Sequence, residues 1–321
     1  MRAAVATLLI AGAGQLGSRY LQGLAKCRTP LRIYVQDIDA DSLDRAEQRW
    51  NEALGTETHH AASFHASVES LPRQLDIAIV TTTANVRPRV IGKIASLAAV
   101  RFWVLEKVLA QSESGLDEIE SHIANESNAW VNTPRRMMPW HQQIKSQLGL
   151  TRPLTLKVEG GPWGLACNAV HYLDLVAWWS GETLQNVRTE RLHANWIESK
   201  RPGYQEVAGT LEAQFSGGSR ALLSANEIGT CESLVVSDDH LSWQIDETEG
   251  LARRSDGIDI PGRINLQSEM STGLVEFILE NGCCELPALR ESSALHRVFI
   301  RSMLAHWQRA GNPAATFVPI T

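Results

Sequence analysis

The chain has 321 residues, of which 44% are hydrophobic and 21% are charged, and its formal net charge is −6 at pH 7. This length allows two domains with separate cores, and the composition is typical of a soluble globular protein rather than of a disordered one. Because the sequence contains neither a dense basic run nor an apolar stretch long enough to span a bilayer, it argues against a nucleic-acid partner and a membrane partner.

The cysteines and the N-terminus bear on the cellular compartment. The five cysteines are an odd number without C-x-x-C spacing, so we expect neither a disulfide framework nor a metal site. The apolar stretch after Met1 and Arg2, with the small residues Ala11-Gly12-Ala13, imitates a short signal peptide. Cleavage there would destroy the glycine-rich segment that starts at Gly12, so we expect a cytoplasmic protein.

A glycine-rich segment follows a short apolar run at the start of the chain. Residues 7–11 predict a buried strand that leads into a G-x-G-x-x-G motif, Gly12-Ala13-Gly14-Gln15-Leu16-Gly17. Glycines at this spacing let the backbone turn sharply and approach a pyrophosphate, and the helix predicted over residues 18–26 directs its positive end at the phosphates. We therefore expect cofactor contacts from Gly12, Gly14, Gln15, Leu16 and Gly17.

An acidic residue follows the next predicted strand, which spans residues 31–36. Asp37 stands twenty residues beyond Gly17, where a carboxylate can accept hydrogen bonds from the ribose hydroxyls of a dinucleotide. This favours NAD, with NADP as the alternative cofactor. Asp37 could instead begin the turn before the next helix, because Asp is common in turns and at helix N-caps.

Strands and helices alternate along the first part of the chain. Helices are predicted over residues 42–54, 88–98 and 114–125, and strands over residues 75–80, 101–105 and 129–132. This alternation predicts a Rossmann domain with a doubly wound parallel sheet, which we assign to residues 1–133. Ligands bind at the carboxyl ends of such strands, so we expect further cofactor contacts from Thr81, Thr82, Thr83, Asn85, Glu106 and Lys107.

The pattern changes beyond residue 133. Helices are predicted over residues 141–148, 168–179, 267–280 and 292–309, and an extended segment over residues 154–158. Strand-like alternation covers residues 187–192, 206–215, 220–225, 233–236 and 241–245, with a hairpin turn at Gly217-Gly218. Residues 134–321 are therefore predicted to form an α+β domain that carries a mostly antiparallel sheet.

Two sets of side chains have the chemistry for proton transfer. Lys107 follows a buried strand and can bind a substrate hydroxyl or carbonyl, although it could equally belong to a solvated charge pair with Glu106. His171 and Asp174 lie three residues apart, so on a helix they share a face and the carboxylate can orient the imidazole. A histidine near an aspartate on an amphipathic helix is more often structural, which is the alternative for this set.

Taken together, these motifs resemble those of the Gfo/Idh/MocA family of NAD(P)-dependent oxidoreductases, and the resemblance covers nearly the whole chain. Residues 12–17 match the nucleotide loop of the family, Glu106-Lys107 matches its E-K-P motif, and residues 168–174 match its D-x-G-x-H-x-x-D motif. The resemblance implies that Lys107, His171 and Asp174 are the catalytic residues. It also implies that the second domain, residues 134–321, binds substrate and mediates oligomerisation, so that the chain forms a homo-oligomer through the sheet of this domain.

The sequence departs from the family pattern at two places. Val108 replaces the proline of E-K-P, whose fixed φ shapes the loop around the nicotinamide. Asn168 replaces the first acid of the second motif, which makes the pocket less negative and substitutes a hydrogen-bonding amide. Because Lys107 and His171 are both retained, an active enzyme is favoured.

The leading hypothesis is hydride transfer between a nicotinamide and a hydroxyl-bearing carbon of a sugar, nucleotide sugar or polyol. Binding across the two domains would orient the substrate and exclude water. One alternative is a non-catalytic dinucleotide-binding regulator, and another is an enzyme that reduces an imine or a conjugated system. We expect the hydroxyls of the substrate to be recognised by Asn132, Arg135, Asn168, Tyr172 and Asp174.

Overall fold

The computed structural model describes residues 5–54, 59–123, 128–148, 153–229 and 232–321. Its backbone contacts divide the chain into two compact units. The first comprises Met1–Leu109, Gly115–Asn132 and Asn265–Arg290, and the second comprises Ala110–Ser114, Thr133–Ile264 and Glu291–Thr321. One boundary between the units lies after Asn132, next to the expected boundary after residue 133. Residues 265–290, which were expected in the second domain, group with the first unit instead.

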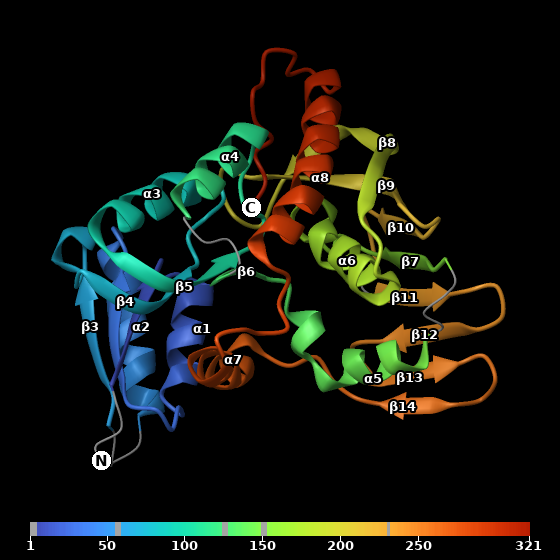
Figure 1. Cartoon of the computed structure of the whole chain (residues 1–321). Coiled ribbons are helices and arrows are strands. Elements are labelled where there is room, and N and C mark those ends of the chain that lie inside the picture. Colours follow the sequence, from blue (N-terminus) through green and yellow to red (C-terminus); the bar gives the residue numbers. More distant parts are fainter. Residues whose placement is uncertain (1–4, 55–58, 124–127, 149–152, 230–231) are drawn as a thin grey trace. The chain divides into compact units, whose positions relative to one another are not determined.

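A six-stranded parallel sheet lies at the centre of the first unit (Figure 1). Its strands follow the order β3-β2-β1-β4-β5-β6, with bounds β1 Ala6–Ala11, β2 Leu31–Gln36, β3 Ala61–His65, β4 Gln74–Val80, β5 Ala99–Glu106 and β6 Ala129–Asn132. The consecutive residues Leu8, Leu9 and Ile10 are fully buried. Both faces of the sheet are therefore covered, because neighbouring side chains of a strand point to opposite faces. The doubly wound sheet predicted from the sequence is confirmed.

Helices connect these strands, and each of the four predicted ones begins one to three residues earlier than predicted. The connecting helices are α1 Gln15–Leu24, α2 Ala40–Ala53, the short η1 Val68–Ser70, α3 Arg87–Leu97 and α4 Glu113–His122, and the unit also contains α7 Gln267–Asn281. Helix α1 includes the last glycine of the motif. Helix α2 begins at Ala40 because the Asp39 carboxylate caps it by accepting from the backbone N–H of Ser42 at 3.1 Å. The predicted end of α4 at residue 125 lies outside the described residues.

Helix α7 packs against α1 in the first unit, far from it in sequence. A Cβ atom added at Gly23 would lie 2.4 Å from the carbonyl oxygen of Ser268, so the two helices can approach this closely only at a glycine. The hydroxyl of Thr272 donates to the carbonyl of Gly23 at 2.7 Å, and Arg28 pairs with Glu276 at 2.9 Å. These contacts explain why α7 belongs to the first unit although most of the second unit precedes it.

The second unit carries an eight-stranded sheet in the order β14-β13-β12-β11-β7-β10-β9-β8. All neighbouring strands are antiparallel except β7 and β10, which are parallel, so the predicted, mostly antiparallel sheet is confirmed. The bounds are β7 Thr155–Gly160, β8 Leu184–Glu198, β9 Gln205–Phe215, β10 Arg220–Ala225, β11 Glu232–Ser237, β12 Ser242–Asp246, β13 Leu251–Arg254 and β14 Asp259–Pro261.

Two features of this sheet differ from the prediction. Strand β8 is much longer than predicted, because its pairing with β9 shifts register three times and each shift interrupts the alternation of apolar and polar residues. The strands β13 and β14, at one end of the sheet, are missing from the prediction because strands of four and three residues carry too few alternations to be recognised. The hairpin turn between β9 and β10 is present, and Gly218 adopts φ +100° there.

The second unit contains a short 3-10 helix and three α-helices among the described residues. Their bounds are η3 Pro134–Met137, α5 Pro139–Gln147, α6 Leu165–Ser180 and α8 Leu289–Arg309. Helix α6 contacts β9 and β10 and begins earlier than predicted. The reason is a distant cap: the carboxylate of Glu206 accepts from the backbone N–H groups of Ala166 at 2.8 Å and Cys167 at 3.2 Å.

The C-terminal residues are fixed within the second unit. Val318 and Ile320 are fully buried, the N–H of Val318 donates to the carbonyl of Gln111 at 3.0 Å, and the amide of Gln111 donates to the carbonyl of Ile320 at 3.0 Å.

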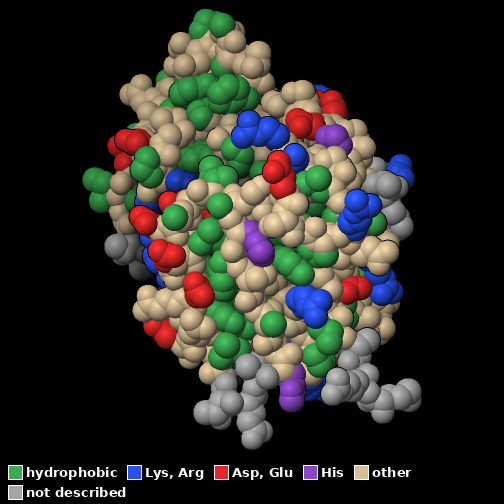
Figure 2. All heavy atoms as spheres, turned by 90° about the vertical axis from the view of Figure 1, so that its left-hand side faces the viewer, with side chains coloured by type: hydrophobic (Ala, Val, Ile, Leu, Met, Phe, Trp, Pro, Cys, Tyr) green, Lys and Arg blue, Asp and Glu red, His purple; other side chains and the backbone are tan. Residues whose placement is uncertain are grey.

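On the face that Figure 2 shows, Lys and Arg side chains are interspersed with Asp and Glu. Among the described residues, no helix is both long and apolar enough to cross a membrane.

Candidate active site

The glycines of the G-x-G-x-x-G motif have three distinct geometries. Gly12 has φ +102°, which side chains with a Cβ rarely adopt, and a Cβ there would lie 2.9 Å from the backbone nitrogen of Thr82. A Cβ at Gly17 would lie 1.8 Å from the carbonyl oxygen of Gly12. A Cβ at Gly14 would meet nothing within 4 Å. The outer two glycines therefore permit close packing of the loop, and the middle one faces open space.

The N-terminus of α1 opens into the same space. Gly14 is its N-cap, no side chain caps it, and its first turn has no acidic residue. The first N–H groups of a helix have no partner within the helix, so this end suits an anion such as a pyrophosphate. Gln15 is exposed, and its side-chain oxygen accepts from Arg49 at 3.1 Å; Leu16 is half-buried. The loop thus has the shape and polarity that the phosphates of a dinucleotide require.

Asp37 is connected to this loop directly. One carboxylate oxygen accepts from the backbone N–H of Ala13 at 2.6 Å, and the other accepts from the backbone N–H of Asp39 at 3.0 Å. The second hydrogen bond is that of an Asx turn, so the alternative reading of Asp37 as a turn residue holds as a local description. The first one places the carboxylate beside the glycine loop, which is the position that the expected ribose-binding role requires. The two readings are compatible.

The side chains of the loop after β4 differ in their hydrogen-bond partners. The hydroxyl of Thr81 donates to the carbonyl of Gly12 at 2.6 Å, so this side chain holds the glycine loop. The hydroxyl of Thr83 donates to the side-chain oxygen of Asn85 at 2.7 Å. The hydroxyl oxygen of Thr82 is buried and has no hydrogen-bond partner among the described residues. Of these four expected cofactor contacts, Thr82 is thus the one with a buried polar atom left for a ligand.

Glu106 lies at the end of β5 in a buried polar cluster. One of its oxygens accepts from the hydroxyl of Tyr20 at 3.0 Å and from the amide of Asn132 at 2.6 Å. The same amide nitrogen of Asn132 also donates to Gln267 at 2.9 Å, which engages both of its N–H groups. Burial raises the pKa of Glu106, against the opposing effects of these hydrogen bonds and of nearby positive charges. Asn132, expected to contact substrate, is only 3% exposed and here supports Glu106.

Lys107 is half-buried and directly follows β5. The peptide bond between Lys107 and Val108 is cis. Val108 and Leu109 are fully buried, and the carbonyl groups of both accept hydrogen bonds from the guanidinium of Arg87. Val108, which stands where the E-K-P motif has a proline, is therefore packed in the core, and its carbonyl is held by a buried arginine.

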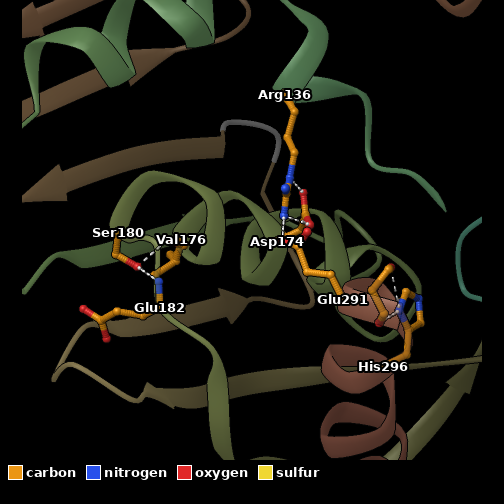
Figure 3. A network of polar contacts seen from close by, with 8 residues as sticks. Arg136, Asp174, Val176, Ser180, Glu182, Glu291 and His296 are labelled. Carbon is orange, nitrogen blue, oxygen red and sulfur yellow. Dashed lines mark hydrogen bonds and ion pairs between the residues drawn. The ribbon is translucent and has the colours of Figure 1, made fainter. Parts of the chain in front are cut away.

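In the second unit, α6 carries His171 and Asp174 one turn apart, and His171 is half-buried. Both oxygens of Asp174 accept from the guanidinium of Arg136, at 2.7 and 2.9 Å, and Arg136 also pairs with Glu291 of α8 at 2.6 Å. Figure 3 shows this network. Burial raises the pKa of Asp174, while the guanidinium acts in the opposite direction. Asp174, the acid that was expected to orient the histidine, is therefore half of a buried ion pair with Arg136.

A second polar cluster surrounds Tyr172. The guanidinium of Arg135 lies 4.6 Å from the centre of the Tyr172 ring and donates to its hydroxyl at 3.3 Å. Trp163 meets the same ring edge-on at 5.4 Å, and its carbonyl accepts from the amide of Asn168 at 2.9 Å. The second unit therefore brings together three of the residues expected to recognise substrate: Arg135, Asn168 and Tyr172.

The charge of Arg135 is balanced by Glu247 on the loop after β12. Arg135 binds both carboxylate oxygens at 2.7 and 2.6 Å, and the buried ring of His141 contacts one of them at 3.1 Å. Burial alone would raise the pKa of Glu247, but Arg135 and His141 outweigh it and hold the pKa well below its usual range. Arg135 is consequently half of a close ion pair.

Sequence reasoning missed four side chains that organise these clusters: Tyr20, Arg87, Arg136 and Glu247. Tyr20 sits on the apolar face of α1, where a tyrosine is indistinguishable from a core residue. The arginines have no sequence feature that separates them from exposed ones. Only Arg87 carried a usable signal, because it begins the helix directly after a strand end that was expected to bind cofactor.

Comparison with known proteins identifies relatives of the fold. No protein-family model matches the sequence, and no curated protein matches it. A UDP-N-acetylglucosamine 3-dehydrogenase from Acidithiobacillus ferrooxidans is similar with a TM-score of 0.68 and 14% identity, over 96% of this chain and 99% of that one. A scyllo-inositol dehydrogenase from Lactobacillus casei, with bound NAD(H) and scyllo-inositol, is similar with a TM-score of 0.68 and 13% identity, over 95% and 98%.

A third solved structure is GenD2 from gentamicin A biosynthesis in complex with NAD, with a TM-score of 0.69 and 14% identity over 94% of each chain. At these identities the likeness concerns the fold. Nearly the full length of each protein takes part in it, so both units of the chain have counterparts in these structures. The chain has the fold of sugar and inositol dehydrogenases.

Proposed function

We propose that the chain is an NAD-dependent oxidoreductase that transfers a hydride between nicotinamide and a hydroxyl-bearing carbon of a sugar, nucleotide sugar or polyol. The observation that carries the proposal is the glycine loop, in which Gly14 faces open space at an uncapped helix N-terminus while Asp37 bonds to the loop backbone. The similar structures that hold NAD(H) support it. The dinucleotide, when bound, supplies or accepts the hydride.

The remaining chemistry requires a group that exchanges a proton with the reacting oxygen. When the alcohol is oxidised, its carbon loses a hydride and its hydroxyl loses a proton, and we assign the proton to His171. A neutral imidazole accepts a proton near neutral pH and returns it in the reverse reaction. Lys107 is assigned to polarise the same oxygen by hydrogen bonding. The buried ion pair between Asp174 and Arg136 fixes the helix turn that follows His171.

The preference for NAD rests on the charge beside the ribose site. Asp37 and Asp39 place two carboxylates at the turn after β2. The pKa of Asp39 lies below its usual value, chiefly because its carboxylate accepts from the side chain of Ser42. The extra phosphate of NADP would meet these negative charges, whereas the ribose hydroxyl of NAD can donate to Asp37.

We also expect a homo-oligomer that associates through the sheet of the second unit, and sedimentation velocity tests this directly. Strand β7 exposes Lys157 and Glu159 on one face of that sheet, and Arg191 of β8 pairs with Glu212 of β9 at 2.7 Å. Reversing the charge of Lys157 and Glu159 together should shift an oligomer toward monomer. An unchanged sedimentation coefficient would place the interface elsewhere.

The activity is tested by following NADH formation at 340 nm with a panel of sugars, nucleotide sugars and polyols. We expect turnover with at least one of them, and its loss in His171→Ala and Lys107→Met. The matched controls are His59→Ala and Lys26→Met, which change exposed residues of the same types. Tight NAD binding without turnover, unchanged by His171→Ala, would instead support a dinucleotide-binding regulator.

A further inference from the structure

Arg87 is a buried cation that connects the ends of two neighbouring strands. It is the first residue of α3 and is 1% exposed. Its guanidinium donates to the carbonyl of Thr82, in the loop after β4, and to the carbonyls of Val108 and, at 3.1 Å, Leu109, after β5. One side chain thus holds together the two loops from which Thr82 and Lys107 come.

The stability of α3 does not account for an arginine at this position. A positive charge in the first turn opposes the positive end of the helix dipole, and burying a cation is costly unless it is paired or hydrogen-bonded. The exposed Arg89 shows that the same helix also carries an arginine in solvent. The carbonyl oxygens are what compensate for burying Arg87, so its position is explained by the loops that it joins.

The backbone that follows Lys107 lacks the proline that would otherwise restrict its conformation. Position 108 holds valine, whose φ is free to vary, where the motif that the sequence resembles has a proline with a fixed φ. Arg87 holds the carbonyl of Val108 itself and that of the next residue. Its charge also favours the ionised form of Glu106, which lowers the pKa of that carboxyl against the effect of burial.

We propose that Arg87 is a positioning residue for Lys107, supplying by hydrogen bonds the loop constraint that position 108 lacks. This inference rests on the proposed function for its effect on turnover, but its effect on the loop can be measured without it. Arg87 does not touch the reacting atoms. It acts by fixing the backbone on the carboxyl side of Lys107 and the loop that contains Thr82.

The test compares Arg87→Met, Val108→Pro and the double variant, with Arg89→Met as the matched control on the same helix. Because small misplacements of a reacting group are costly, kcat of Arg87→Met should fall at least about tenfold while the Kd for NADH stays within about threefold. Hydrogen exchange of the amides over residues 104–110 should become faster. Adding Val108→Pro should restore part of kcat and slow this exchange, and Arg89→Met should resemble the wild type in both.

Three results would overturn the proposal. The first is wild-type kcat and wild-type hydrogen exchange in Arg87→Met, and the second is a loss of kcat in Arg87→Met that adding Val108→Pro does not reduce. The third is a loss of kcat in Arg89→Met equal to that in Arg87→Met. If Arg87→Met does not fold, Arg87→Lys takes its place, with and without Val108→Pro, because lysine keeps the charge but cannot reach both strand ends with a planar fork. If the wild type turns over no substrate, the proposed function fails, and the hydrogen-exchange rates over residues 104–110 in the same variants still decide whether Arg87 fixes the loop.

Discussion

Alanine substitutions at Gly14 and Gly17 should affect different properties, although the two residues are only three positions apart: cofactor binding at Gly14 and stability at Gly17. The Cβ of Gly17→Ala would lie 1.8 Å from the carbonyl oxygen of Gly12 and 2.8 Å from the hydroxyl oxygen of Thr81. Non-bonded carbon atoms pack at about 3.5–4.0 Å, so the loop must move. Overpacking of this kind typically costs about 1–3 kcal/mol, and the contact with rigid backbone places this variant at the upper end.

For a domain of this size, a loss of about 3 kcal/mol corresponds to a decrease in Tm of about 6–12 °C. Gly14→Ala should be different, because its Cβ meets nothing within 4 Å and its φ of −60° and ψ of −166° suit alanine. Alanine is a poorer N-cap than glycine, so we expect less than about 1 kcal/mol of destabilisation. Its methyl group would instead occupy the space assigned to the pyrophosphate, and the Kd for NADH should rise at least about tenfold, or 1.4 kcal/mol.

Urea unfolding of the cofactor-free protein measures stability, and titration of NADH fluorescence measures binding. Gly273→Ala is the matched control, because Gly273 is exposed on α7 and a Cβ added there also meets nothing within 4 Å. The stability of this variant should rise slightly, since alanine favours a helix more than glycine does, and its affinity for NADH should not change. Wild-type affinity for NADH in Gly14→Ala would refute the assignment of this space to the pyrophosphate. Wild-type stability in Gly17→Ala would refute the packing argument.

Three further predictions concern the second unit. Glu247→Gln should destabilise it by about 3 kcal/mol at pH 7, since Arg135 loses its buried partner. The pKa of Glu247 is depressed in the folded state, so its ionised carboxylate stabilises the fold above the unfolded pKa of about 4.3, and this stabilisation is lost as the pH falls below that value. The urea midpoints of wild type and variant should therefore converge on acidification. A difference between the two midpoints that does not change with pH would contradict this. Asp174→Asn should cost about 3 kcal/mol in urea unfolding by weakening its pair with Arg136, whereas full stability with lost turnover would make Asp174 chiefly catalytic. Ile320→Ala, at a fully buried position, should cost about 2–5 kcal/mol, and an unchanged Tm would mean that the C-terminal segment does not contribute to the core.

The sequence alone sufficed for the features that depend on local order. The glycine spacing, the apolar run before it and the position of Asp37 all lie within one contiguous segment, and their geometry follows from backbone sterics and strand–helix periodicity. The alternation of strands and helices likewise predicted the parallel sheet, since each connection is short. In the second unit the alternation predicted an antiparallel sheet but failed where β8 shifts register against β9.

Only the tertiary structure decided which partners the polar groups meet. Glu106 is paired with Tyr20 and Asn132, and Asp174 with Arg136, across long separations in sequence. Periodicity indicates which face of an element is buried, but it does not say which distant side chain lies opposite. The assignment of α7 to the first unit and the burial of Arg87 between two strand ends have the same cause, because both depend on contacts that form only when separate segments pack together.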